Sequence, residues 1–249
     1  MDLKETNTPQ IVLVTCKVLA SALERVLPTD LAAEVRILEY GLHRVPVKLT
    51  GALQETLDEI ERPSLVVLGY GLCGNGLKDI RAGRHTLLVP RADDCIAILL
   101  GSYRAYMRQF AAEPGTYYLT KGWLESGSHP LKEYQEYLPK YGEEQTLWLL
   151  DQQYQHYSRV ALVASTPEEM AVYREQAQEV ARFCGRWGMR YEEVLGSDDY
   201  VRRLVETAIA LRDGASAPEC RNSSGMIEVA SDFLVIPPGG QIRQDMFMR

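Results

Sequence analysis

Three cysteines occupy comparable positions in the sequence, each shortly after an apolar run. They are Cys16 after residues 11–15, Cys73 after residues 65–69 and Cys95 after residues 86–90. Thiolates bind soft metal ions and iron–sulfur clusters. Three thiolates on three separate loops can therefore hold one inorganic centre and leave a further coordination position for a substrate.

The runs before these cysteines predict where the thiols lie. Each run is short and rich in Val, Leu and Ile, as is typical of strands buried on both faces of a parallel sheet. In an open parallel sheet, ligands bind beyond the carboxyl ends of the strands. We therefore expect Cys16, Cys73 and Cys95 to lie together at one edge of a sheet and to bind a metal centre there.

The segment around Cys73 is rich in glycine, which favours close approach of the backbone to a bulky group. Its candidate cofactor-binding residues are Gly71, Gly74, Asn75 and Gly76. Helices predicted at 77–82 and 96–110 would place Cys73 and Cys95 near helix N-termini, where the helix dipole favours a thiolate. A phosphate loop is the alternative, but the segment lacks both the Walker A ending and a GxGxxG register.

Two further residues are candidates for the same site. His43 follows the second predicted strand, 35–40, and is a candidate fourth metal ligand, although a single His is usually a surface or capping residue. Asp94 precedes Cys95 and is a candidate cofactor-binding residue, although capping of the following helix explains it equally well.

A simpler interpretation of the cysteines stays open, because free Cys commonly packs as a small buried hydrophobe. The spacing contains no CxxC pair. Cys184 lies on the apolar face of a predicted helix and is expected in a core, and Cys220 lies in a polar loop and is expected to take no part. No Ser-His-Asp order and no HExxH motif supports hydrolytic chemistry.

Strand and helix patterns alternate along the chain with short loops, which predicts an α/β fold. Beyond the elements already named, helices are expected at 18–26, 49–60, 167–187 and 198–211. A turn and short strand are expected at 113–120, and strands at 160–164, 188–194 and 232–238. We expect two Rossmann-like lobes with mainly parallel sheets. Residues 9–112 would carry the cysteine site, and residues 113–249 would form the second lobe with a Tyr-rich connecting segment at 134–157.

Composition limits the classes of partner. The chain has 249 residues with a net charge of −7, and 46% of its residues are hydrophobic. An acidic chain without a basic face is unsuited to nucleic acid. Five cysteines without secreted spacing, a polar N-terminus and no apolar run of about 18 residues predict a cytoplasmic protein with reduced thiols and no membrane partner.

The same residues resemble domain-of-unknown-function family 1638 over about 11–205. The matching motifs are Val14-Thr15-Cys16, Gly41-Leu42-His43-Arg44-Val45-Pro46, Gly69-Tyr70-Gly71-Leu72-Cys73-Gly74-Asn75-Gly76-Leu77, Asp94-Cys95, Leu100-Gly101-Ser102 and Glu113-Pro114-Gly115-Thr116-Tyr117-Tyr118-Leu119-Thr120. The family more often carries His where this chain has Asp94, and Asn where it has Arg44. No His ligand is therefore available at position 94.

The resemblance implies a role in anaerobic one-carbon metabolism, since family members occur near corrinoid-dependent methyltransferases. By analogy of fold alone, quinolinate synthase, diphthamide synthase and the 2-hydroxyacyl-CoA dehydratases hold a 4Fe–4S cluster on three cysteines and leave one iron free. The main hypothesis is therefore a 4Fe–4S cluster on Cys16, Cys73 and Cys95, with a small-molecule substrate, water or His43 at the fourth position.

Two other hypotheses stay open. In the first, the same thiolates bind Zn²⁺ and activate a substrate thiol for methyl transfer. In the second, the protein is no enzyme but a module that docks a corrinoid protein or methyltransferase through the Tyr-rich segment 134–157, since Tyr is enriched in interfaces. Those tyrosines could equally pack one lobe against the other. Homo-oligomerisation is a further partner expectation.

Overall fold

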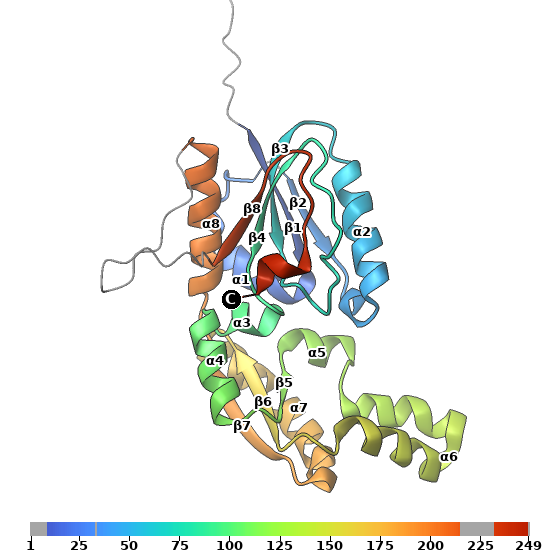
Figure 1. Ribbon diagram of the computed structural model, residues 1–249. Helices are drawn as coiled ribbons and strands as arrows, with labels where there is room; N and C mark the ends of the chain where they lie inside the picture. Colours follow the sequence, from blue (N-terminus) through green and yellow to red (C-terminus); the bar gives the residue numbers. More distant parts are fainter. Residues whose placement is uncertain (1–8, 33, 215–231, 249) are drawn as a thin grey trace, which may run out of the picture. The chain divides into compact units, whose positions relative to one another are not determined.

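The computed structural model describes residues 9–32, 34–214 and 232–248 (Figure 1). The chain divides into two compact units. The first unit comprises residues 1–98 and 199–249, and the second unit comprises residues 99–198. The predicted α/β class with mainly parallel sheets is confirmed.

The first unit is built on a five-stranded sheet in the order β2-β1-β3-β4-β8. The strands are β1 (Gln10–Cys16), β2 (Glu34–Leu38), β3 (Ser64–Gly69), β4 (Thr86–Pro90) and β8 (Phe233–Ile236). The first four are parallel, and β8 is antiparallel to β4. The chain passes from β1 to β2 on one side and then to β3 on the other, so the strand order reverses between β1 and β3. Ligands commonly bind at such a reversal.

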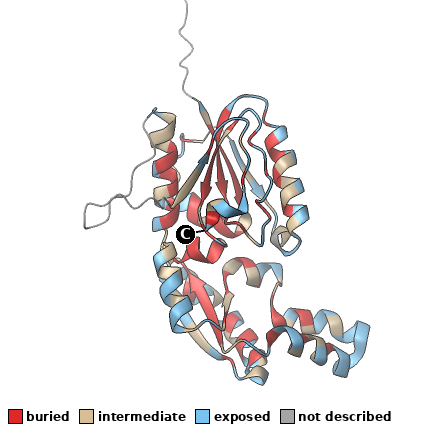
Figure 2. Ribbon diagram, in the orientation of Figure 1, coloured by how far each residue is buried: buried red, intermediate tan, exposed pale blue. Residues whose placement is uncertain are grey.

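Helices cover both faces of this sheet, because its central strands are apolar on both sides. They are α1 (Lys17–Val26), α2 (Pro46–Asp58) and α8 (Asp199–Arg212), with the 3₁₀ turn η1 (Leu42–Arg44) before α2. On the α2 face, Leu53 and Leu57 pack with Val12, Val14 and Val66. Figure 2 shows the central strands of this sheet as buried. The carboxyl ends of the strands are thereby held in one row.

The second unit has a three-stranded parallel sheet in the order β5-β6-β7. Its elements are α4 (Tyr103–Ala112), β5 (Thr116–Leu119), α5 (Lys121–Ser126), α6 (Pro130–Tyr154), β6 (Arg159–Ala164), α7 (Pro167–Cys184), η2 (Gly185–Trp187) and β7 (Arg190–Leu195). Helix α6 is broken at Gly142, where φ is 74°, and its halves form a hairpin (Figure 1). The Tyr154 hydroxyl closes this hairpin by donating to Glu133 Oε2 at 2.7 Å.

Two predicted helices differ from the structure. The helix expected at 77–82 is absent, and residues 73–79 instead form consecutive turns, with Cys73, Asn75 and Asp79 at positive φ. The helix expected at 96–110 is two helices, α3 (Cys95–Leu99) and α4. The chain bends between them at Gly101, where φ is 84° and an added Cβ would stand 2.7 Å from the Cβ of Ser197. A periodic pattern continues through such a bend, since only the backbone changes direction there.

The boundary between the units differs from the predicted division into 9–112 and 113–249. Helix α8 and strand β8 belong to the first unit, because β8 pairs with β4 and α8 contacts α1, β1 and β3. The chain after β8 adds to the same core, since Ile242 is fully buried and exchanges backbone hydrogen bonds of 2.9 Å with Asp79 and Ile80. It ends in the short η3 (Gln244–Phe247).

Membrane crossing requires a long apolar helix. The helices within residues 9–32, 34–214 and 232–248 include none that is both long and apolar enough to span a bilayer.

Candidate functional site

Three thiols line a single pocket in the first unit, which we call the cysteine pocket. Its lining residues are Cys16, Val18, Glu39, Leu42, Gly69, Tyr70, Cys73 and Cys95. The cysteines come from the chain segments that follow β1, β3 and β4, which are neighbours in the sheet. The pocket therefore lies at the carboxyl edge of the sheet and includes the place where the strand order reverses.

Cys16 is both the last residue of β1 and the residue that precedes the first turn of α1. Its side chain is half-buried. Burial raises the pKa of its thiol, and the backbone N–H of Val18 offsets part of that rise by donating toward the sulfur. The strand-to-helix turn thus presents the sulfur to the pocket with one backbone donor beside it.

Cys73 is positioned by direct hydrogen bonding between two loops. The backbone N–H groups of Leu72 and Cys73 donate to the carbonyl oxygens of Ala92 and Asp93, each at 2.8 Å. The backbone of Cys73 has φ 48°, a left-handed conformation that turns the chain at this residue. The loop after β3 is therefore tied to the loop after β4, which carries Cys95.

Burial raises the pKa of the Cys73 thiol to about 12, with smaller contributions from the neighbouring Asp94 and Cys16. The backbone N–H groups of Gly71 and Cys95 favour the thiolate and offset part of this rise. We expected a helix dipole to favour the thiolate here. That expectation is wrong for Cys73, because no helix follows it and desolvation dominates.

Cys95 is the most buried of the three, with 8% of its surface exposed. It begins the short helix α3. Burial raises the pKa of its thiol well above the usual range, and the nearby Cys73, Asp94 and Cys16 raise it further. Cys95 does lie at a helix N-terminus, as expected, but burial outweighs the backbone N–H that lowers the pKa of its thiol. Cys16 therefore acts on the pKa of both other thiols, and Cys73 acts on that of Cys95.

The residues predicted to bind a cofactor do not line the cysteine pocket. Gly71 lies against the backbone of Asp94, and Gly76 lies against Leu49 of α2, where an added Cβ would stand 2.5 Å from Cδ2. Gly74 and Asn75 are exposed. These positions allow the loop to turn and to pack closely, which explains the glycines without a ligand.

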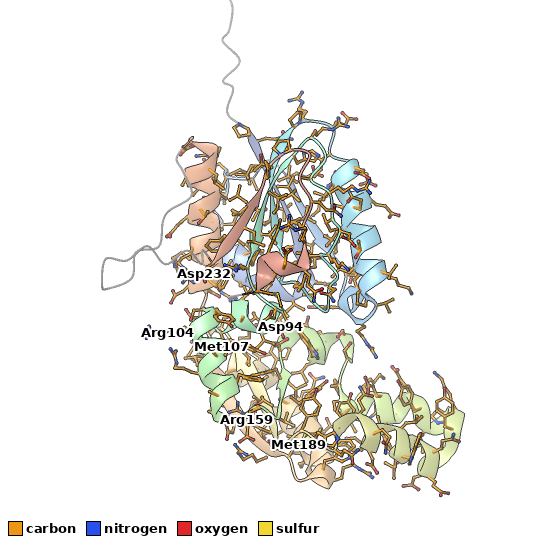
Figure 3. The ribbon with its side chains drawn as sticks, viewed as in Figure 1. Asp94, Arg104, Met107, Arg159, Met189 and Asp232 are labelled. Atoms are coloured by element: carbon orange, nitrogen blue, oxygen red, sulfur yellow. The ribbon has the colours of Figure 1, made fainter. Side chains whose placement is uncertain are left out.

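Asp94 lies beyond the carboxyl ends of the strands (Figure 3). Its Oδ1 accepts a hydrogen bond of 2.9 Å from the backbone N–H of Ile96. Burial raises the pKa of its carboxyl group, and this group in turn raises the pKa of Cys73 and Cys95. Asp94 thus caps the start of α3 and adds negative charge beside the cysteine pocket.

The remaining predicted residues have different outcomes. The side chain of His43 lies outside the described residues, and its backbone belongs to η1, next to Leu42 of the pocket lining. Cys184 is fully buried in the core of the second unit. Cys220 lies outside the described residues.

Tyr70 is a pocket residue that the sequence reasoning missed. It follows β3 directly, and only 3% of its surface is exposed. Its hydroxyl is buried and has no hydrogen-bond partner among the described residues. Burial and the nearby Cys16 and Cys73 raise the pKa of this hydroxyl above its ordinary value. Its place directly after a buried strand, at the same edge as the cysteines, was the available signal.

The space enclosed by the pocket is about 10 Å³, which suits one water molecule. Across the part of the chain that the structure describes, no three His, Cys, Asp or Glu side chains are grouped to hold a single metal ion. The three thiols thus share a pocket without closing around one point. A metal centre there would require the side chains to turn and the pocket to open.

Comparison with known proteins identifies a family. A family model described as a protein of unknown function, DUF1638, matches residues 37–205. No curated protein and no solved structure matches the chain. The matched range includes Cys73 and Cys95 and begins after Cys16.

Proposed function

The chain belongs to the DUF1638 family, and from that premise we propose that it holds a 4Fe–4S cluster on Cys16, Cys73 and Cys95. The observation that carries this proposal is that thiols from three separate loops line one pocket. The pocket lies at the reversal of strand order, where α/β sheets commonly bind their ligands. Packing as small hydrophobes would not require three distant cysteines to converge there.

The chemistry of the pocket suits a metal centre. Its lining contains three soft sulfur donors and the carboxylate of Glu39, and no Lys, Arg or His is among the described side chains that line it. Ionised thiols at such a place need positive charge beside them, and a metal centre supplies that charge. The donor set therefore fits an iron–sulfur centre.

A single zinc ion is the alternative centre for the same three thiols. Tetrahedral zinc with bonds of about 2.3 Å to sulfur brings its sulfurs to about 3.8 Å from one another. The residues that the structure describes contain no such close group, although the three thiols share a pocket. In a cluster, each thiolate would bind a different iron, so the three sulfurs would not need to close around one ion.

The residues around the thiols would hold and tune the centre. Backbone N–H groups of Val18, Gly71 and Cys95 donate toward the cysteine sulfurs, and such donors shift the reduction potential of a cluster. Leu42 and Val18 add apolar surface that limits water around the sulfurs. A cluster on three thiolates leaves one iron able to bind a small-molecule substrate as a Lewis acid or to pass an electron.

The setting of this activity is also part of the proposal. Thiolate-bound iron requires a reducing compartment, which supports the cytoplasm. The family resemblance supports anaerobic one-carbon metabolism near a corrinoid methyltransferase system. For the alternative of docking through residues 134–157, Tyr134, Tyr154 and Tyr157 pack with the core of the second unit, which gives these rings a structural role.

The test is metal analysis under exclusion of air. After reconstitution, we expect about four iron and four sulfide per chain, with the absorption of a cluster. Cys16→Ser, Cys73→Ser and Cys95→Ser should each lose most of this iron, whereas the matched control Cys184→Ser should retain it. A protein that contains zinc and no sulfide would indicate a single-ion site and not a cluster. Full iron content in Cys73→Ser would overturn the assignment of the ligands.

A further inference from the structure

The hydroxyl of Tyr70 is an unsatisfied polar group at the wall of the cysteine pocket. The side chain is 3% exposed, and its hydroxyl oxygen has no partner among the described residues. An unsatisfied buried hydroxyl destabilises a fold by about 1–3 kcal/mol, so natural proteins rarely retain one without use. Because of this loss of stability, we expect the hydroxyl to bind a group that the described residues do not supply.

The position of the hydroxyl is set by rigid surroundings. Tyr70 follows Gly69, whose lack of a side chain lets the ends of β3 and β1 meet at Thr15. The ring packs in the core on the α2 face, with Leu49 and Leu77 among the fully buried members of that core. The ring is therefore held by the core at the wall of the pocket.

The surroundings of the hydroxyl also indicate which kind of atom it meets. Cys16, Cys73 and Tyr70 line the same pocket, and no hydrogen bond joins the hydroxyl to either sulfur in the described structure. A phenol hydroxyl makes its strongest hydrogen bonds to oxygen atoms that carry negative charge. Such an oxygen would belong to a small ligand of a metal centre held by the cysteines that line the same pocket as Tyr70.

We propose that the Tyr70 hydroxyl donates a hydrogen bond to the oxygen atom of the ligand that completes the metal centre. This inference rests on the proposed function, because the ligand oxygen would bind at the iron that three cysteine ligands would leave open. It assigns the substrate class as small molecules that coordinate through a carboxylate or alkoxide oxygen. Tyr70 is then a residue for substrate binding and specificity. It does not strengthen the binding of ligands that coordinate through a thiol.

The experiment compares wild type with Tyr70→Phe, which keeps the ring and removes only the hydroxyl. Tyr40→Phe is the matched control, since Tyr40 belongs to the same unit but does not line the pocket. Iron and sulfide are counted first, and all three proteins should contain the same amounts. Formate and 2-mercaptoethanol are then titrated into the reduced protein, with the EPR spectrum of the cluster as the readout.

We expect formate binding to weaken at least about tenfold in Tyr70→Phe and to stay unchanged in Tyr40→Phe, as suits the loss of a charge-assisted hydrogen bond. Binding of 2-mercaptoethanol should be equal in all three. Equal formate affinity in wild type and Tyr70→Phe, or no formate binding to the wild-type cluster, would overturn the inference while the cluster itself stands. Absence of iron from wild type would instead overturn the proposed function and this inference with it.

A measurement without metal separates a ligand-binding hydroxyl from a structural one. In the metal-free protein, Tyr70→Phe should unfold at the same or a higher urea concentration than wild type, because it removes an unsatisfied buried group. A hydroxyl with a structural partner would make the variant less stable. A lower midpoint in metal-free Tyr70→Phe would therefore contradict the inference.

Discussion

The backbone of Gly71 lies directly against the backbone of Asp94, so that a Cβ on Gly71 would stand 2.7 Å from the Asp94 carbonyl carbon. This contact brings the loop after β3 against the loop after β4. The backbone hydrogen bonds of Leu72 and Cys73 extend the same contact. The positions of Cys73 and Cys95 relative to each other therefore depend on the absence of one methyl group.

Replacing Gly71 by Ala should separate the two loops. Both sides of the contact are backbone and neither can turn aside, so we expect a loss of about 1–3 kcal/mol or more in the free energy of unfolding. The amount of iron bound per chain should fall together with the stability. The control is Gly51→Ala within α2, where an added Cβ meets nothing within 4 Å. That change should leave the iron unchanged and stabilise the protein by up to about 1 kcal/mol in urea titrations.

The thiol of Cys73 should be nearly inert in the metal-free folded protein. Its pKa is raised to about 12, so at pH 8 only about one thiol in 10⁴ is ionised, and the thiolate is the reactive form. Alkylation by iodoacetamide should accelerate about tenfold for each pH unit from 7 to 9. Peptide mass spectrometry measures this rate, with the same protein in urea as the reference. Equal rates in the folded and unfolded protein would contradict the burial of this thiol.

The second unit should lose stability in mild acid through His129. Burial lowers the pKa of this imidazole, whose Nδ1 accepts a hydrogen bond of 3.3 Å from the backbone N–H of Lys132 at the start of α6. Protonation removes that acceptor. Because the unfolded chain binds the proton more readily, stability is retained above about pH 6.5 and falls as the pH drops below it.

His129→Asn tests this account, since Asn caps a helix without titrating. Its stability should depend less on pH between 5 and 7 than that of wild type. Tryptophan fluorescence is a selective readout, because all three tryptophans, Trp123, Trp148 and Trp187, lie in the second unit. A pH dependence equal to that of wild type would exclude His129 as the titrating group.

The segment after β8 should be needed for the stability of the first unit. Ile242 is fully buried there and pairs through its backbone with Asp79 and Ile80. We expect Ile242→Ala to lower the free energy of unfolding by about 2–5 kcal/mol. Met248→Ala removes a side chain that is 72% exposed and should change stability by less than about 0.5 kcal/mol. Circular dichroism follows the unfolding of both units, and tryptophan fluorescence identifies the part that belongs to the second unit. Similar losses in both variants would contradict the packing.

Local patterns predicted most elements because the backbone responds to its immediate neighbours. The run at 160–164 lies within β6, and Thr166 caps α7 by accepting from the N–H of Glu169, with Pro167 at the first helical position. The breaks at Gly101 and Gly142 were not predicted, since apolar spacing continues past them. The turns that continue through residues 77–79 were not predicted either, because the sequence there was interpreted as the start of a helix at 77–82.

From sequence alone, the alternation of buried strands with helices determined the α/β class and the placement of three cysteines after three strands. The tertiary structure alone decided that β8 returns to the first sheet, that Tyr70 joins the pocket wall, and that burial outweighs the backbone N–H donors beside Cys73 and Cys95. Strand pairing and desolvation depend on residues far apart in the chain. A local sequence pattern therefore does not predict strand pairing or desolvation, because each depends on which distant residues the folded chain brings nearby.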